Sequence, residues 1–161
     1  MFPIDLIALS NNLINTCREQ NIKIATAESC TGGLIAGCLT SVSGSSDVFD
    51  RSFITYTNES KVSMLGVSLN TIMIYGAVSE PVAKQMCEGA LKKAPVQLTV
   101  ATTGIAGPNG GTPDKPVGMV QIASAFLHKP TISECYEFEG GRDAIRISSI
   151  IKAIEMMLKQ I

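Results

Sequence analysis

The residues best suited to chemistry lie in the stretch 27–33, Ala-Glu-Ser-Cys-Thr-Gly-Gly. The apolar run 22–27 predicts a short buried strand before it, and residues 34–39 predict a helix packed on the core after it. Gly32 and Gly33 allow a tight turn, so Ser29 is expected where a strand passes into a helix. Unpaired N–H groups at a helix start could stabilise an oxyanion beside an attacking hydroxyl. A serine that only caps a helix explains the same residues.

Cys30 follows Ser29 directly and is a rival nucleophile. The chain has five cysteines and no C-x-x-C pair, which is typical of reduced thiols in a cytoplasmic protein rather than of a disulfide framework. His128 is the only histidine and falls in a predicted loop. This composition argues against a zinc site and against a Ser-His-Asp triad.

Tyr56 and Lys61 lie on either side of a predicted boundary between a strand and a helix that begins near Asn58. The positive end of a helix disfavours a protonated lysine, and a neutral amine can act as a general base. Lowering a lysine pKa from about 10.4 to near 7 takes roughly 4–5 kcal/mol. The helix end supplies about 1 kcal/mol, so burial must supply most of the rest, against Glu59. A solvated lysine and a half-buried tyrosine are the ordinary alternatives.

Arg142 and Arg146 are four residues apart near the start of the last predicted helix, directly after Gly140-Gly141. They share one helix face, where two cations are unfavourable unless an anion lies beside them. Arginines at a glycine-opened helix start are suited to phosphate. Neutralisation by Asp143 and Glu139 explains the pair equally well.

Residues 103–118 are rich in Gly and Pro and have no periodicity, which predicts a long loop. A loop of about 15 residues within a compact domain is more often functional than idle. Its segment 104–111 matches neither the dinucleotide fingerprint nor a P-loop.

Strand and helix patterns alternate along the rest of the chain. This order predicts an α/β fold, a single-domain three-layer αβα sandwich around a mixed β-sheet that spans residues 1–161. Strands are expected at 22–27, 49–57, 96–102, 119–125 and 134–138, and helices at 4–20, 34–41, 58–66, 69–75, 79–93 and 140–161.

Composition excludes several classes of protein. Of the 161 residues, 45% are hydrophobic and 17% are charged, which is typical of a globular chain with a large core. A net charge of −1 without a basic block argues against a nucleic-acid partner. No apolar run approaches about 20 residues, so no membrane span is expected. The first residues lack a basic region and a cleavage site, so no signal peptide is expected.

With these residues in view, the sequence resembles the CinA C-terminal domain family, the nicotinamide-nucleotide amidohydrolases. The similarity spreads over nearly the whole chain in the family's order. The family's other common domain, an N-terminal molybdopterin-binding-like half, has no counterpart in the sequence, which favours the stand-alone amidohydrolase. The matching segments are 27–34, 56–61, 75–79, 103–108, 111–118 and Gly141-Arg142 with Arg146.

The resemblance implies hydrolysis of nicotinamide mononucleotide (NMN) to nicotinate mononucleotide and ammonia, in pyridine nucleotide recycling and without a metal or other cofactor. Ser29 would be the nucleophile of an acyl-enzyme mechanism, Lys61 the general base, and Tyr56 the hydroxyl that positions or relays the proton. Backbone N–H groups of Cys30, Thr31 and Gly32 would hold the oxyanion. The substrate-binding residues would be Gly33, Thr103, Gly104, Ala106, Gly107, Arg142 and Arg146.

Two other functions fit the same sequence. The first is a nucleotide-binding or regulatory module without turnover, in keeping with the family's competence- and damage-inducible label. The second is an amidase for another pyridine or ureido substrate. The very apolar terminal helix also leaves a homodimer open.

Overall fold

The computed structural model describes all residues from 1 to 161 and contains one five-stranded sheet with the strand order β2-β1-β3-β4-β5. Strand β1 (Ile24–Glu28) pairs in parallel with β2 (Phe49–Ile54) and with β3 (Leu98–Gly104). Strands β4 (Met119–Phe126) and β5 (Ile132–Glu137) continue the sheet in antiparallel order. The predicted α/β class with a mixed sheet is therefore confirmed.

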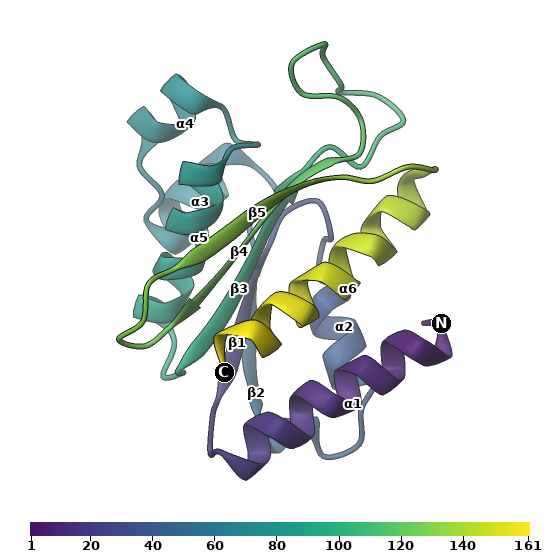
Figure 1. Cartoon of the computed structure of the whole chain (residues 1–161). Helices are drawn as coiled ribbons and strands as arrows, with labels where there is room; N and C mark the ends of the chain where they lie inside the picture. The colour runs from purple at the N-terminus through teal and green to yellow at the C-terminus, as the bar shows by residue number, and fades with distance from the viewer.

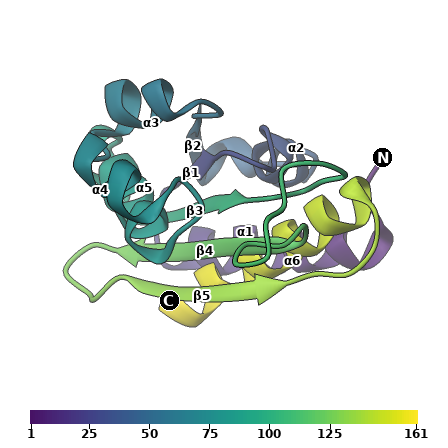
Figure 2. The same ribbon diagram turned by 90° about the horizontal axis from the view of Figure 1, so that it is seen from above.

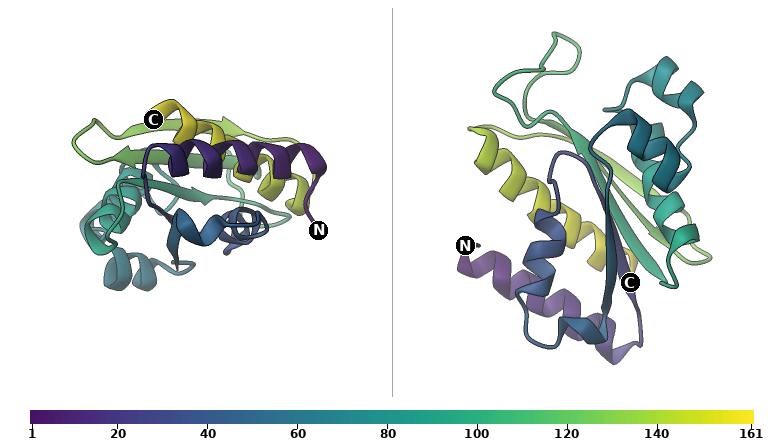
Figure 3. Two further views of the ribbon diagram at one scale, coloured as in Figure 1. Left: turned by 90° about the horizontal axis from the view of Figure 1, so that it is seen from below. Right: turned by 180° about the vertical axis from the view of Figure 1, so that it is seen from behind.

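Helices cover both faces of this sheet (Figures 1 and 3). Three of them lie on one face: α1 (Ile4–Glu19), α2 (Leu34–Thr40) and α6 (Arg142–Gln160). The other three lie on the opposite face: α3 (Asn58–Leu65), α4 (Leu69–Tyr75) and α5 (Glu80–Lys93). A 3₁₀ turn, Ser45–Asp47, leads into β2.

The two faces of the sheet carry side chains of different size. Large residues such as Leu98, Val100 and Ile122 point into the core shared with α1 and α6. Alanines such as Ala101 and Ala123 face α5 instead. Successive strand residues point to opposite faces, so this alternation follows directly from the strand period. The small residues let α5 approach the sheet closely.

The connection after β2 differs from the prediction in a way that matters for Lys61. Strand β2 ends at Ile54, three residues before the expected end, and residues 55–57 form an extended link. Thr57, rather than Asn58, caps α3, because its extended backbone lets its hydroxyl accept a hydrogen bond from the Ser60 N–H at 3.1 Å.

Exposed apolar side chains do not lie where the sequence suggested. Helix α6 has no exposed large apolar residue, because its apolar face is packed against the sheet and α1. Helix α6 therefore offers no exposed apolar face to a second copy of the chain. Four of the eleven exposed large apolar residues lie on α4: Leu69, Met73, Ile74 and Tyr75. None of the helices combines the length and apolar content that a bilayer crossing requires.

The carboxyl ends of β1 and β3 meet at one edge of the sheet. Figure 2 views this edge and shows α3 on one side of it and the beginning of α6 on the other. Chain segments that follow parallel strands in such sheets form the usual ligand crevice. The residues singled out from the sequence lie around this edge.

Candidate active site

Ser29 is the first residue after β1, in a turn that leads to α2. Its backbone N–H donates to the carbonyl of Thr102 on the neighbouring strand at 3.0 Å. Its side chain is buried except for a small part, with 7% of the residue exposed, and it lines a cavity. The hydroxyl is thus held at the end of a rigid sheet and remains accessible from one direction.

Lys61 lies next to Ser29 and is almost completely buried, with 1% of the residue exposed. Its Nζ lies 3.0 Å from Ser29 Oγ, and it donates to the Thr55 carbonyl at 3.0 Å and to the Tyr56 carbonyl at 3.4 Å. No carboxylate forms an ion pair with it. Burial lowers the pKa of Lys61 below its ordinary value, and the nearby Cys30 partly opposes this.

The neutral form of the Lys61 amine can satisfy all three of its neighbours. Carbonyl oxygens can only accept, so the carbonyls of Thr55 and Tyr56 each take an N–H. A neutral amine has two N–H groups and one lone pair. The lone pair is then directed at Ser29 Oγ, where a general base has to be.

Cys30 lines the same cavity, but its thiol differs from a reactive one. Burial raises the pKa of Cys30 to about 11. At neutral pH this cysteine is therefore protonated, and the thiolate is the form that attacks.

The turn after Ser29 has a different hydrogen-bond pattern from the one expected. The N–H groups of Cys30 and Thr31 donate to no backbone carbonyl. Gly32 donates to the Ser29 carbonyl at 3.0 Å, and Gly33 donates to the Glu28 carboxylate at 2.9 Å. The N–H groups of Gly32 and Gly33 are thus both bound to acceptors within the protein. The two free donors lie in the turn and not in the first turn of the helix.

Glu28 explains why the helix start is not free. This fully buried carboxylate accepts N–H groups from Gly33, Ile35 and Ala36 at 2.9–3.0 Å. Three hydroxyl groups also donate to it, those of Thr26, Thr31 and Ser52. Glu28 was not predicted to have this role. The available signal was an acidic residue that directly ends an apolar strand, where only a well-paired carboxylate can be buried.

The cavity beside Ser29 has a volume of about 210 Å³. Because an apolar cavity of ~150 Å³ holds benzene, there is room for one six-membered ring with a small substituent. Ten residues line it: Ser29, Cys30, Tyr56, Asn58, Lys61, Ala77, Val78, Thr103, Gly104 and Ala106. Thr103 also donates from its hydroxyl to the Ala77 carbonyl at 2.9 Å, which ties two walls together.

Some of these lining residues were not singled out from the sequence. Asn58 lies three residues before Lys61 on α3, so the helical spacing places both on one face, and that was a usable signal. Ala77 and Val78 carry no chemical signal of their own, because a small apolar wall has no recognisable residue type.

The hydroxyl of Tyr56 is not bonded to Ser29 or Lys61. It accepts a hydrogen bond from Arg142 Nη2 at 3.2 Å, and 58% of the residue is exposed. Arg142 Nη1 also donates to the Gly107 carbonyl at 2.8 Å. The expected phenol relay is therefore absent from this geometry, because the Lys61 amine contacts Ser29 directly. Tyr56, Gly107 and Arg142 instead form a group at the mouth of the cavity.

Arg146 lies apart from that mouth. Its Nη2 donates to the Thr31 carbonyl at 2.9 Å, and it lines a separate hollow near the N-terminus. Neither Arg142 nor Arg146 forms an ion pair, so the neutralisation by Asp143 and Glu139 is not observed. The two arginines therefore have different surroundings despite their shared helix.

The long loop contributes less to the cavity than expected. Gly104 and Ala106, at its start, line the cavity, whereas residues 108–113 surround a second hollow farther along the loop. Figure 1 shows this loop rising beyond the edge of the sheet. Only its first residues reach Ser29's surroundings, because the chain leaves the sheet after Gly104.

The fold and the site together define a class of protein. It is an α/β protein in which a serine directly after the first strand contacts a buried lysine. Comparison with known proteins makes this more specific. A family model described as CinA C-terminal domain matches residues 6–161. The chain belongs to the CinA C-terminal domain family, and the resemblance expected from the sequence is confirmed.

Individual relatives match over very different shares of their length. The nicotinamide-nucleotide amidohydrolase PncC of Escherichia coli is 42% identical over 160 residues, which cover 99% of this chain and 97% of that protein. A CinA-like protein of Syntrophobacter fumaroxidans is 49% identical over 140 residues, which cover 87% of this chain. The chain spans about a third of the length of that relative, with 33% covered.

A solved structure has nearly the same fold. The crystal structure of competence/damage inducible protein CihA from Agrobacterium tumefaciens superposes with a TM-score of 0.97 at 43% identity. The superposition covers 99% of this chain and 97% of that one.

Proposed function

We propose that this chain is a nicotinamide-nucleotide amidohydrolase that converts NMN and water to nicotinate mononucleotide and ammonia. The observation that carries the proposal is the 3.0 Å contact between Ser29 Oγ and the buried Lys61 amine. The similarity to the E. coli amidohydrolase over nearly the full length of both proteins supports the choice of substrate. The cavity has room for a pyridine ring with its carboxamide.

In the proposed mechanism, neutral Lys61 takes the proton of Ser29 as Ser29 Oγ attacks the amide carbon. The oxyanion accepts hydrogen bonds from the free N–H groups of Cys30 and Thr31. The Lys61 ammonium then gives its proton to the amide nitrogen, and ammonia leaves. Water attacks the resulting Ser29 ester, with Lys61 again as the base, and nicotinate mononucleotide is released.

The mouth of the cavity suits the rest of the nucleotide. With the carboxamide at Ser29, the ribose and phosphate extend toward Tyr56 and Arg142. Arg142 carries a charge without a carboxylate partner, so it is free to pair with a phosphate. Tyr56 then has a binding role at the mouth rather than a role in proton transfer.

A nucleotide-binding module without turnover is the competing function. Such a module has no use for a lysine that is buried at the cost of its charge, and Lys61 is 1% exposed without a counter-ion. The buried amine therefore favours the enzyme.

The decisive assay measures ammonia from NMN with purified protein and no added metal. Turnover is expected for the wild type, and Ser29→Ala and Lys61→Met are each expected to lose at least about 10³-fold in kcat while remaining folded. Tight binding of NMN without ammonia release would favour the binding module. Turnover of other pyridine amides in place of NMN would redirect the substrate.

A further inference from the structure

Arg146 is directed at the backbone of the turn after Ser29. Its Nη2 donates to the Thr31 carbonyl at 2.9 Å, whereas Arg142 points to the mouth. Arg146 Nε is buried and has no hydrogen-bond partner. No carboxylate forms an ion pair with the Arg146 guanidinium. Its only hydrogen bond within the protein is therefore to this turn.

Thr31 is held at its side chain as well as at its carbonyl. Its hydroxyl donates to Glu28 Oε2 at 2.8 Å. It also contacts Thr102 Oγ1 at 2.9 Å, and because the Thr31 proton goes to Glu28, Thr102 is the donor there. With its side chain and its carbonyl both held, Thr31 can shift little, and this fixes where its backbone nitrogen lies.

That N–H is one of the two free donors of the turn. Thr31 is fully buried, and its N–H has no partner in the protein. A buried backbone donor without a partner is costly and calls for an explanation. In the proposed reaction the oxyanion supplies this acceptor, beside Cys30, which lines the cavity in the same turn.

We propose that Arg146 is a positioning residue of the oxyanion turn and not a ligand of the substrate phosphate. Glu28 and Arg146 hold Thr31 from its side chain and its carbonyl, and together they orient the Thr31 N–H. Gly32 fits the same arrangement, because a Cβ there would lie 3.3 Å from Arg146 Nη2. The inference rests on the proposed role of Ser29 but not on NMN as the substrate.

The test separates nucleophile chemistry from nucleotide binding. A small alkyl fluorophosphonate reacts at Ser29 by forming an Oγ–P bond, with loss of fluoride and transfer of the hydroxyl proton to Lys61. Its phosphoryl oxygen needs the oxyanion donors, but the reagent carries no nucleotide phosphate. Arg146→Met is measured by the second-order labelling rate, and by kcat and KM with NMN.

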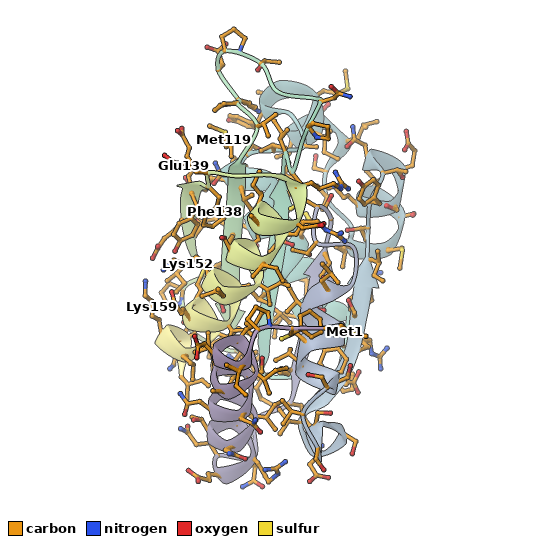
Figure 4. The ribbon with its side chains drawn as sticks, turned by 90° about the vertical axis from the view of Figure 1, so that its right-hand side faces the viewer. Met1, Met119, Phe138, Glu139, Lys152 and Lys159 are labelled. Carbon is orange, nitrogen blue, oxygen red and sulfur yellow. The ribbon has the colours of Figure 1, made fainter.

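Lys152→Met is the matched control. Lys152 is a cation on the same helix (Figure 4), where it pairs with Glu155 away from the turn. We expect Arg146→Met to reduce labelling and kcat about 10- to 100-fold with KM changed less than about threefold, as for a misplaced reacting group. Arg146→Lys should recover part of the loss, and Lys152→Met should match the wild type.

Each other outcome is informative. Unchanged labelling with a raised KM in Arg146→Met would overturn the inference and return Arg146 to the phosphate. If Arg146→Met does not fold, Arg146→Gln is measured in the same two assays with the same criteria. A wild type that is labelled at Ser29 but releases no ammonia from NMN refutes only the substrate. Absence of labelling at Ser29 overturns the inference itself.

Discussion

As the proposed base, Lys61 has to be neutral to accept the proton of Ser29. Burial lowers its pKa, so the amine loses its proton at a lower pH than a free lysine, whose pKa is about 10.4. We therefore expect kcat/KM to rise with pH and to level off at an apparent pKa below about 10.4. The measurement is ammonia release between pH 5 and 10. A rate that falls as the pH is raised through this range would contradict a lysine base.

The adjacent thiol allows a sharp comparison. Because burial raises the pKa of Cys30 to about 11, its thiol is protonated at neutral pH. We expect Cys30→Ala to keep kcat within about tenfold of the wild type, whereas Ser29→Ala loses at least about 10³-fold. The assay is ammonia release from NMN. If Cys30→Ala were inactive and Ser29→Ala active, the nucleophile would be misassigned.

At this scale the sequence identifies residue types but not their partners. Ser29 and Lys61 could be named because each lies at a predicted turn or helix start, which is local information. The carbonyls of Thr55 and Tyr56 could not be foreseen as the acceptors of Lys61, because every residue has a carbonyl. Arg142 and Arg146 have the same residue type and share one helix, and only the fold gives them different hydrogen-bond partners.

Helix α2 depends on one carboxylate for its start. Replacing Glu28 by Gln removes a charge that accepts three N–H groups and directs an amide NH₂ at those donors. We expect a loss of about 3 kcal/mol in the free energy of unfolding. For a chain of this size that is a decrease in Tm of roughly 6–12 °C. Thermal unfolding measures it.

The control for this variant is Glu155→Gln. Glu155 pairs with Lys152 on the surface of α6, where an ion pair contributes at most about 1 kcal/mol. Equal Tm values for the two variants would show that Glu28 is not the cap the geometry indicates.

The approach of α5 to α3 links packing to the position of Lys61. At Gly89 on α5, a Cβ would lie 2.1 Å from the carbonyl oxygen of Leu65, the last residue of α3. Alanine favours a helix by about 1 kcal/mol over glycine, but the clash is with backbone and requires α3 to move. We expect Gly89→Ala to lose about 1–3 kcal/mol of stability and to lower kcat, because α3 carries Lys61.

Gly141 offers the matched substitution. A Cβ there meets no atom within 4 Å, and its φ of −82° suits any residue. Gly141 is the N-cap of α6, where alanine is less favourable than glycine, so Gly141→Ala should lower the stability by at most about 1 kcal/mol. Urea unfolding of both variants, with ammonia release as the second measurement, checks the prediction.

The elements themselves were largely readable from the chain. Helices α1, α4, α5 and α6 begin and end within a few residues of their predicted bounds, because apolar period and glycine or proline signals agree there. The end of β2 at Ile54 was not, because Thr55 and Tyr56 have high strand propensity. Their carbonyls accept hydrogen bonds from Lys61, a tertiary contact that propensity does not contain.

The whole molecule brings segments from distant parts of the chain to one mouth. Tyr56 follows β2, Gly107 follows β3, and Arg142 begins the last helix, yet hydrogen bonds join all three. All three residues were predicted as site residues from the sequence. The sequence did not indicate that Arg142 forms hydrogen bonds with the other two. The parallel order of β2, β1 and β3 explains the meeting, because it places the carboxyl ends of those strands at one edge.

This mouth defines the last prediction. If Arg142 binds the phosphate of NMN, Arg142→Ala should raise the KM for NMN about 10- to 100-fold, since a lost charge-assisted contact costs about 1.5–3 kcal/mol. Nicotinamide riboside has the same ring and sugar but no phosphate, so its KM should change less than about threefold. The ratio of the two KM values in wild type and variant isolates the phosphate contact from any disturbance of Tyr56.

The same pair of substrates distinguishes the two arginines. Arg146→Met removes the hydrogen bond to the turn after Ser29. It should lower kcat equally for NMN and the riboside and leave the ratio of their KM values near that of the wild type. An equal rise in KM for both substrates in Arg142→Ala would mean that Arg142 only supports Tyr56 and Gly107. In that case the phosphate is bound by another cation near the mouth, and Lys115, whose Nζ donates to the Tyr75 carbonyl beside Ala77, is the next residue to replace.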